Sequence, residues 1–545
     1  MSKFTVTIID TTGIQSYIFG SNRLRENIGA SHILLQVTGD WLEETLKDLG
    51  VPRNQQQEPI ENSQLPAELV YAGGGNAMVI FRTKSIAVEF TKKLSKKVLI
   101  DAPGINLVVA HTEFEWDTEF LYEIVEKLMQ EKMAQNKYSR IPSTPLLGLG
   151  VNATCNSTQL PAIGRSDEPK YKMPSGSKTY LVSRETGAKL KSVQKANDIL
   201  KQKIFNTDVL NKYELAEDFD DFSRTEGESS YLAVVHADGN GMGKRFQEFG
   251  EGKCNRDYIK ALRQLSKDVH DAGIKALEQI TKILAESIKE DEDGNKTVKG
   301  KFKIKDNFFP FRPIVYGGDD VTFVCDGRIG LELAALYLEK LQEYSLADEK
   351  PLKACAGISI VKTHYPFARS YQLSEALCKE AKRYTKFESK SQKKRPEEKA
   401  NFVALDWHIA SSGLSGSLQE IREREYQVSE GRLNMRPVRL EAHLTDWNIW
   451  KHFTKAVQEF NDEQKWSRNK VIALREILRQ GSQVTQDFRS VYKLREFPSF
   501  ISNTDQDLVK KGWLDEVCGY FDAIEAMDFY FTLGDGSNES VSPEN

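Results

Sequence analysis

Two kinds of hydrophobic pattern alternate along the chain. Short runs rich in β-branched and aromatic residues, such as 4–9 and 232–237, are typical of buried β-strands. Between such runs, apolar residues recur at roughly helical spacing, most clearly over 259–284 and 331–344. We therefore expect an α+β protein in which helices pack against sheets.

Strand-like blocks occur twice, in the same order. Residues 4–10 match 232–238, and each block is an apolar run that ends on an aspartate before a turn, with an offset of 238 − 10 = 228. In the second block, two β-rich runs flank a glycine turn, which predicts a β-hairpin. The turn begins at Gly73 in one copy and at Gly317 in the other, an offset of 317 − 73 = 244.

A third block completes the repeat. One strand runs to His111 and its counterpart to His364, an offset of 364 − 111 = 253. Offsets that grow slowly by insertion are what a duplicated domain predicts. Each copy is then a β-α-β-β-α-β unit, the ferredoxin-like arrangement, over 1–150 and again over 229–410.

The other segments have different patterns. Residues 151–228 are polar and predict a linker or insertion with one helix, Ala188–Ile204. From 411 to 545 the pattern turns helical and predicts a small C-terminal bundle. Its apolar residues fall on one face of a helix: Trp447, Trp450, Phe453, Ala456 and Phe460.

Composition narrows the function classes. The chain has 545 residues, 39 % of them hydrophobic and 28 % charged, with a net charge of −4. These values exclude a mostly disordered chain and make wholesale non-specific nucleic-acid binding a poor expectation. No run of 18 apolar residues predicts a membrane span, and the first strand leaves no room for a signal peptide, so we expect a cytoplasmic protein. None of the six cysteines stands in a C-x-x-C pair, so neither zinc nor a disulfide framework is expected.

The hairpin of the second copy carries the candidate chemistry. Its tip is Gly317-Gly318-Asp319-Asp320, and Asp238 ends the strand predicted beside it. Adjacent carboxylates repel unless a cation neutralises them, and Mg²⁺ prefers hard oxygen ligands. Three such carboxylates form the ligand set of a two-metal phosphoryl-transfer site for Mg²⁺ or Mn²⁺.

A glycine-rich turn follows Asp238. Gly239, Asn240 and Gly241 could offer backbone N–H groups to phosphates, with Lys244 as a point charge. Such a turn is common, and an Asp-Asp pair beside glycines also occurs in plain β-turns. The combination, in order within a repeat, favours the functional interpretation.

The first copy serves as an internal control. It keeps Asp10 but has Gly75 and Asn76 at the positions of the acidic pair. We therefore expect no complete metal site there, only a structural role or nucleotide binding without chemistry.

Histidines add few candidates. His236 precedes Asp238 by two residues on the same strand, and a satisfied hydrogen bond is its expected role. His270, followed by Asp271, has no partner histidines nearby and is expected on a solvated helix face. His364 is kept as a candidate nucleotide contact.

These motifs together resemble the large palm-domain subunit of type III CRISPR effector complexes, a family whose palm fold is shared with the GGDEF diguanylate cyclases and nucleotide cyclases. The resemblance spans about residues 1–410. It is carried by five segments: Ile14–Phe19, Gly29–Ser31, Asp238–Lys244, Gly317–Asp320 and Ala381-Lys382.

The resemblance implies a function. The family makes cyclic oligoadenylates from ATP at its second palm domain. By that likeness, the metal ligands are Asp238, Asp319 and Asp320. The nucleotide site is shaped by Gly317, Gly318, Lys244 and Lys382.

The chain departs from the family pattern in three respects. It begins directly at the first palm-like unit without an HD nuclease domain, it lacks the cysteine pairs of a zinc ribbon, and it is shorter than the usual subunit. We therefore expect a reduced or stand-alone relative that does not cleave DNA.

Two functions of different class follow. The first is a metal-dependent nucleotidyltransferase that makes cyclic oligonucleotides from NTPs, with ATP preferred, in prokaryotic antiviral defence. The alternative is a catalytically silent palm-pair scaffold that binds nucleotide or RNA within a CRISPR ribonucleoprotein. Expected partners are the NTP substrate and either subunits of a CRISPR RNA complex or a second copy of the chain.

Overall fold

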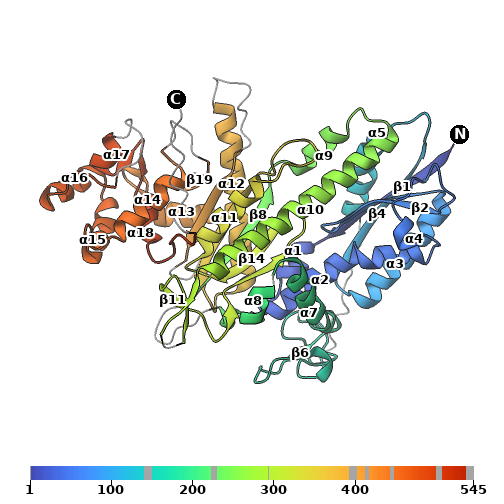
Figure 1. Cartoon of the computed structure of the whole chain (residues 1–545), viewed down its shortest axis with the longest axis horizontal. Helices are drawn as coiled ribbons and strands as arrows, with labels where there is room; N and C mark the ends of the chain where they lie inside the picture. Colours follow the sequence, from blue (N-terminus) through green and yellow to red (C-terminus); the bar gives the residue numbers. More distant parts are fainter. Residues whose placement is uncertain are drawn as a thin grey trace.

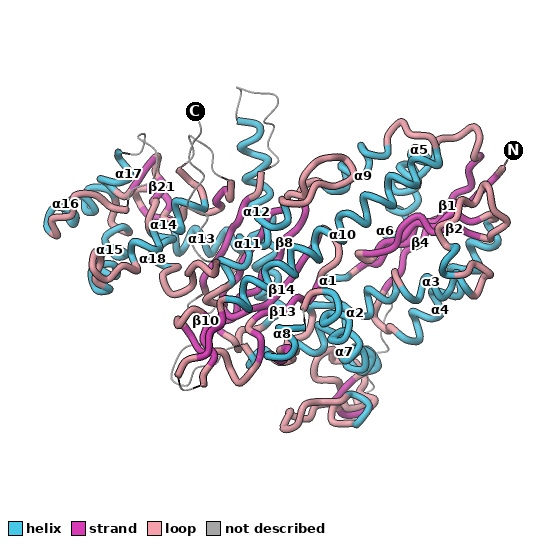
Figure 2. Tube along the Cα trace, viewed as in Figure 1, coloured by secondary structure: helices cyan, strands magenta, loops and turns pink. Residues whose placement is uncertain are grey.

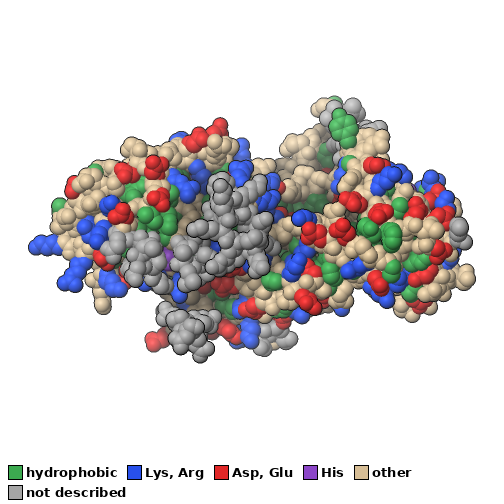
Figure 3. Space-filling model, turned by 90° about the horizontal axis from the view of Figure 1, so that it is seen from above, with side chains coloured by type: hydrophobic (Ala, Val, Ile, Leu, Met, Phe, Trp, Pro, Cys, Tyr) green, Lys and Arg blue, Asp and Glu red, His purple; other side chains and the backbone are tan. Residues whose placement is uncertain are grey.

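The computed structural model describes all residues except 1, 140–149, 206, 223–229, 293, 392–401, 411–415, 442–446, 499–505 and 535–545. The molecule is elongated, with a sheet of N-terminal strands at one end, a larger sheet in the middle and C-terminal helices at the other end (Figure 1). Lys and Arg side chains lie interspersed with Asp and Glu over the N-terminal end (Figure 3). Among the described residues, no helix is both long and apolar enough to span a bilayer.

The N-terminal sheet has four antiparallel strands in the order β2-β3-β1-β4. The strands are β1 (Lys3–Thr12), β2 (Ala67–Gly73), β3 (Asn76–Phe81) and β4 (Asn106–Glu115). Alternation along β1 sends Val6 and Ile8 to one hydrophobic cluster and Ile9 to another. The cluster around Ile9 is completed by α2 (Leu24–Val37), α3 (Asp40–Lys47) and α4 (Lys84–Asp101).

The central sheet has the order β13-β14-β8-β15-β16-β19. Its strands are β8 (Tyr231–Gly239), β13 (Phe311–Val315), β14 (Asp320–Asp326), β15 (Ala354–Lys362), β16 (Ala404–Ile409) and β19 (Val438–Arg439). β8, β13, β14 and β15 pair with one another in antiparallel fashion. When these four strands are numbered in chain order, their order in the sheet is the same as that of the N-terminal sheet. β16 joins parallel to β15 and adds a strand that the predicted β-α-β-β-α-β arrangement does not contain.

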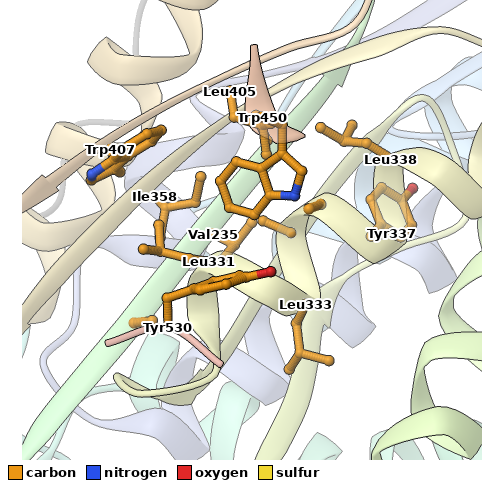
Figure 4. Packing of buried hydrophobic residues seen from close by; sticks show 14 of the residues in the cluster. Val235, Leu331, Leu333, Tyr337, Leu338, Ile358, Leu405, Trp407, Trp450 and Tyr530 are labelled. Atoms are coloured by element: carbon orange, nitrogen blue, oxygen red, sulfur yellow. The ribbon is translucent and has the colours of Figure 1, made fainter. Parts of the chain in front are cut away.

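Helices cover both faces of the central sheet. Ala233, Val235 and Ala237 of β8 point into a cluster with α10 (Asn255–Glu286) and α11 (Gly330–Gln342), the two helices predicted from periodicity. The intervening Val234 points to the opposite face, where α12 (Phe367–Ser391) packs. Figure 4 shows Val235 close to Leu331 of α11 within the first of these clusters.

One long helix joins the two sheets. The N-terminal half of α10 places Ile259 and Leu262 in the hydrophobic cluster of the N-terminal sheet, whereas Leu277 and Ile280 lie in that of the central sheet. Figure 1 shows α10 running from the central sheet toward the N-terminal one. Helix α10 therefore contributes side chains to the hydrophobic cores of both units.

The segment between the units forms more structure than one helix. Its main element is α7 (Arg184–Lys203), which starts four residues before the predicted helix. Short elements accompany it: β5 (Gly164–Arg165), β6 (Leu181–Val182), α8 (Thr207–Lys212) and β7 (Glu214–Leu215). The smaller strands β9 (Ile288–Glu290), β10 (Lys296–Val298), β11 (Phe302–Lys303) and β12 (Phe308–Phe309) follow α10.

The C-terminal region is not purely helical, so that prediction was incomplete. Its helices are α13 (Leu418–Tyr426), α14 (Trp450–Phe460), α15 (Arg468–Leu478), α16 (Ser482–Val491), α17 (Gln506–Lys511) and α18 (Phe521–Glu525). A small sheet lies among them (Figure 2), formed by β17 (Gln427–Val428), β18 (Gly431–Arg432), β21 (Val517–Cys518) and β20 (Trp513–Leu514). Strands of two residues are too short to produce a recognisable alternation in sequence.

The C-terminal region packs directly onto the central sheet. Trp407 of β16 meets Trp450 of α14 edge-on, with ring centroids 6.1 Å apart (Figure 4). Arg436 and Asp522, both fully buried, form an ion pair of 2.6 Å between Nη1 and Oδ1. Apolar and ionic contacts together fix the helices against the sheet.

Candidate active site

The structure brings two of the predicted carboxylates together. Asp238 lies near the end of β8, Asp320 begins β14, and the two are paired directly across the strands. Side chains opposite each other in an antiparallel pair have Cβ atoms roughly 4.5–5.5 Å apart. Asp319 precedes Asp320 in the hairpin turn and accepts the Gly239 N–H at its carbonyl, at 3.0 Å.

Glycines shape this turn. Gly317 has a φ of +94°, and a Cβ there would come 2.7 Å from the His270 ring. Gly239 has no room for a side chain either, because a Cβ would lie 2.8 Å from that of Asp319. The glycines thus allow the turn to close against α10 on one side and β8 on the other.

His270 of α10 contacts the hairpin turn. Its Nδ1 atom lies 2.8 Å from the Gly317 carbonyl oxygen, within hydrogen-bond distance. The expectation of a solvated position was therefore wrong, because α10 carries His270 beneath the hairpin. Sequence periodicity placed the helix but not the turn that packs on it.

Lys382 of α12 reaches the same carboxylate cluster. Its Nζ atom lies 2.5 Å from Asp238 Oδ2 and donates to the Gly239 carbonyl at 2.8 Å. The lysine side chain is 21 % exposed, so the pair sits at the wall of the site rather than in free solution. The Asp238 carboxylate and the Gly239 carbonyl thus stabilise the positive charge of Lys382, and the same two oxygens suit a metal cation.

The acidic pair is electrostatically unfavourable without a cation. Burial, then the Asp238 carboxylate, raises the pKa of Asp319. Burial, followed by the carboxylates of Asp238 and Asp319, raises the pKa of Asp320 to about 8. Asp320 is half-exposed, but its Oδ1 atom is shielded and has no hydrogen-bond partner in the described structure.

These features fit a divalent cation, although no ligand cage is preformed. Across the described ranges, no group of three or more His, Cys, Asp or Glu side chains converges as metal ligands. Lys382 accounts for part of this, because its ammonium neutralises Asp238. The oxygen ligands, their mutual repulsion and the unpartnered Asp320 Oδ1 nevertheless match the preferences of Mg²⁺ and Mn²⁺.

His236 lies directly behind Asp320. Its Nδ1 atom is 3.1 Å from Thr322 Oγ1, which agrees with the expected hydrogen bond, and 3.3 Å from Asp320 Oδ1. Burial lowers the pKa of His236 to about 4, so the ring is neutral at pH 7.

The glycine-rich turn after Asp238 is only partly available to a ligand. The Asn240 N–H donates to the Lys353 carbonyl at 2.8 Å, and Gly239 is engaged as described above. Gly241 adopts a φ of +65° and is the N-cap of α9 (Met242–Gly250). Lys244 is 79 % exposed and pairs with Glu248 at 3.0 Å, away from the carboxylates.

His364 does not reach the site, so its assignment as a nucleotide contact was wrong. β15 pairs with β8 so that Cys355 lies opposite Asp238, whereas Lys362 lies opposite Tyr231 at the far end. His364 follows that far end and is 71 % exposed.

The strand register also corrects the third repeat block. Asp10 is paired with Val108, and Asp238 with Cys355, which gives an offset of 355 − 108 = 247 rather than 253. His111 and His364 are therefore not equivalent, and their match in sequence is coincidental.

The N-terminal sheet holds a reduced version of the site. Asp10 is paired across the strands with Asn76, as Asp238 is with Asp320. Lys137, on α6 (Ala134–Ser139), forms an ion pair with Asp10. Only one carboxylate remains of the three in the central sheet.

Further residues on α12 face the site and were not identified from the sequence. Tyr371, Glu375 and Lys379 recur every four residues ahead of Lys382, on the helix face turned to Asp238. Glu375 accepts from Lys379 at 2.7 Å and from Gln15 of the N-terminal unit at 2.9 Å. The i, i+4 spacing was the available signal, but apolar and polar residues are mixed along it.

Comparisons with known proteins agree with this architecture. Residues 231–390 match the family model described as Cas10/Cmr2, second palm domain. Comparison with curated proteins gives no match.

Among solved structures, the chain resembles one from the Csm1-Csm4 cassette in complex with cA4. That match has 14 % identity and a TM-score of 0.52, and it covers 97 % of this chain and 69 % of the other. Similar values hold for the cassette with AMPPNP, at 14 % identity, TM-score 0.51 and coverage of 97 % and 70 %. The Csm1-Csm4 subcomplex of the type III-A CRISPR-Csm interference complex also matches, at 14 % identity, TM-score 0.51 and coverage of 97 % and 70 %. At this level of identity the likeness concerns the fold.

Proposed function

We propose that this chain, whose residues 231–390 are a second palm domain of the Cas10/Cmr2 family, is a metal-dependent nucleotidyltransferase. It joins NTPs, with ATP as the preferred substrate, into cyclic oligonucleotides that act in CRISPR-type antiviral defence. The observation that carries this proposal is the cross-strand pair of Asp238 and Asp320 at the hairpin tip, with Lys382 beside it.

The side chains divide the work of the reaction. Asp238, Asp319 and Asp320 hold Mg²⁺ or Mn²⁺, which when bound supplies Lewis-acid stabilisation of the phosphoryl charge. Lys382 exchanges its contact with Asp238 for the triphosphate and neutralises part of its charge. A ribose hydroxyl of one nucleotide attacks the α-phosphate of another, and pyrophosphate leaves.

The backbone supplies the remaining contacts. Gly317, Gly318 and Gly239 let a nucleotide approach the turn without side-chain clashes. The N–H groups in the first turn of α9, after Gly241, lie at the positive end of the helix and suit phosphate oxygens. Lys244 reaches the phosphates only if it releases Glu248.

Several comparisons support a nucleotide product. Chains of similar fold come from structures of the Csm1-Csm4 cassette in complex with cA4, cA3 or AMPPNP.

We also propose that the chain is built from two copies of one ferredoxin-like unit, over 1–150 and 229–410. The equal strand order of the two sheets and the matching lysine–aspartate pairs, Lys137 with Asp10 and Lys382 with Asp238, support duplication. The segments 151–228 and 411–545 are then an insertion and an added C-terminal domain.

The proposed partners are other subunits of a CRISPR ribonucleoprotein, or a second copy of the chain. The matching structures contain Csm1 and Csm4 together, which supports the first option.

One observation favours the alternative of a silent scaffold. Within the described part of the chain no metal-ligand group is preformed, and Lys382 already neutralises Asp238. Such a site could hold a nucleotide phosphate on Lys382 without turnover.

Product analysis distinguishes the two functions. Purified protein is incubated with each NTP and Mg²⁺ or Mn²⁺, and products are resolved by mass spectrometry. Asp319→Ala combined with Asp320→Ala should abolish the product. The matched control changes two consecutive acidic residues of the C-terminal region, Asp462 and Glu463, to alanine together. This variant should still make the product.

Two results would count against the enzyme. Product that survives in the Asp319/Asp320 variant would refute the site. ATP binding by the wild-type chain without any product would favour the scaffold.

A further inference from the structure

Behind the acidic pair lies a buried polar face of the sheet. His236 and Asp238 point to the same side of β8, and they are paired with Thr322 and Asp320 of β14. The four side chains therefore share the face on which α12 packs. His236 is only 4 % exposed, so its ring is fixed by its neighbours.

The His236 ring is held by an aromatic stack. Tyr371 of α12 meets it edge-on, with centroids 5.5 Å apart and an interplanar angle of 76°. The other side of Tyr371 lies flat against Phe19, at 3.7 Å and 19°. Tyr371 and Phe19 are 2 % and 4 % exposed, and the Tyr371 hydroxyl has no hydrogen-bond partner among the described residues.

Phe19 belongs to the other unit of the chain. It ends α1 (Ile14–Phe19), the short helix that follows β1 and that includes a segment singled out in the sequence without a role. This helix is anchored by two other elements: Asn27 Nδ2 of α2 donates to the Ile18 carbonyl at 2.6 Å, and Lys189 Nζ of α7, in the segment between the units, donates to the Tyr17 carbonyl at 2.8 Å. A contiguous series of contacts therefore leads from α1 to the enclosed Oδ1 atom of Asp320.

We propose that Phe19, Tyr371 and His236 are positioning residues that hold the Asp320 carboxylate, so that the N-terminal unit supports the active site of the central one. His236 closes the space behind Oδ1 and leaves the other oxygen to face the site. The inference rests on the proposed function, because it assigns Asp320 to a cation.

The expected effect is on cation affinity first. Loss of a group that orients a metal-binding carboxylate typically weakens metal binding by about 10- to 100-fold. A variant that only loosens the core would instead lower thermal stability without a selective effect on the cation. The two effects are distinguished by substituting a control residue that is equally buried but does not belong to this series of contacts.

Mn²⁺ binding to the full chain, followed by electron paramagnetic resonance, provides the test. Phe19→Leu and His236→Ala should each weaken Mn²⁺ binding by about tenfold or more. His236→Asn, whose side-chain amide can hydrogen-bond with Thr322 Oγ1 as Nδ1 does, should stay within about threefold of wild type. Phe90→Leu is the matched control, since Phe90 is fully buried in the N-terminal unit but packs on Phe81.

A metal-independent measurement accompanies it. Hydrogen exchange of the peptide that contains 319–322 should speed up in Phe19→Leu and His236→Ala but not in Phe90→Leu. Equal effects of Phe19→Leu and Phe90→Leu in both measurements would overturn the inference. Absence of Mn²⁺ binding in the wild type would refute the proposed metal site, and the exchange result would then decide the positioning role alone.

Discussion

The ion pair between Lys382 and Asp238 leads to a prediction that links stability to cation binding. Lys382→Met keeps the length of the side chain and removes its charge. It leaves Asp238, Asp319 and Asp320 without the nearest positive group, whose Nζ atom lies 2.5 Å from Asp238 Oδ2. We expect the variant to be less stable in EDTA and to recover when Mg²⁺ is added.

The magnitude follows from the partial exposure of the pair. Lys382 is 21 % and Asp238 is 40 % exposed, so the interaction lies between a surface ion pair of about 0–1 kcal/mol and a charge-assisted hydrogen bond of about 1.5–3 kcal/mol. A loss of about 1–2 kcal/mol is expected, and each 1 kcal/mol lowers Tm by roughly 2–4 °C in a domain of this size.

The assay is thermal unfolding in EDTA and in millimolar Mg²⁺. Wild type should gain less stability from Mg²⁺ than Lys382→Met, because in the wild type the cation must first displace the ammonium from Asp238; Lys382→Met should regain most of its lost stability. Lys353→Met is the matched control: Lys353 is 22 % exposed and pairs with Glu441 at 2.7 Å outside the site. Its stability should fall, and its gain from Mg²⁺ should equal that of the wild type.

The reasoning fails if Mg²⁺ stabilises all three proteins equally, or if Lys382→Met is as stable as wild type in EDTA. In the first case the cation does not use the position that the lysine vacates. In the second, the carboxylates do not need the ammonium.

Three further predictions concern the fold. Burial raises the pKa of Glu332 to about 7, so ionisation of this side chain destabilises the folded state progressively between about pH 4.5 and 7. Glu332→Gln should therefore raise the free energy of unfolding by about 3 kcal/mol at pH 8 and leave it unchanged below pH 4, as measured by urea titration at both pH values. Asp522→Asn removes the nearest counter-charge of the buried Arg436 and leaves only Glu525 Oε2, at 3.9 Å; it should cost about 3–5 kcal/mol, which an unchanged urea midpoint would contradict. Gly317→Ala, at a φ of +94°, should cost about 1–2 kcal/mol and lower ATP affinity, and an alanine variant with wild-type Tm would show that the turn can relax.

Local patterns predicted much of the secondary structure. The long helices α10 and α11 were found because apolar residues recur over several turns, which chance rarely imitates. The two hairpins were found because glycines interrupt β-rich runs. The two-residue strands of the C-terminal region were missed, since a pattern of period two needs more residues to be seen.

The register could not be read from similarity alone. Aligning His111 with His364 kept a local similarity in sequence but shifted the two strands by six residues from the alignment that the strand pairing gives, since 253 − 247 = 6. Hydrogen bonding between strands sets the true pairing, and a buried β-strand tolerates many equivalent apolar residues. The alignment also hid that His364 follows the end of β15 that is far from Asp238.

By itself, the sequence determined that Asp238, Asp319 and Asp320 would lie near one another. The first ends a strand, the others form a hairpin tip, and adjacent strands in a repeat bring such ends together. Only the tertiary structure decided what surrounds them. His270, Tyr371 and Phe19 approach from helices that are distant in sequence, and their positions depend on packing between layers, which leaves no local periodic signal.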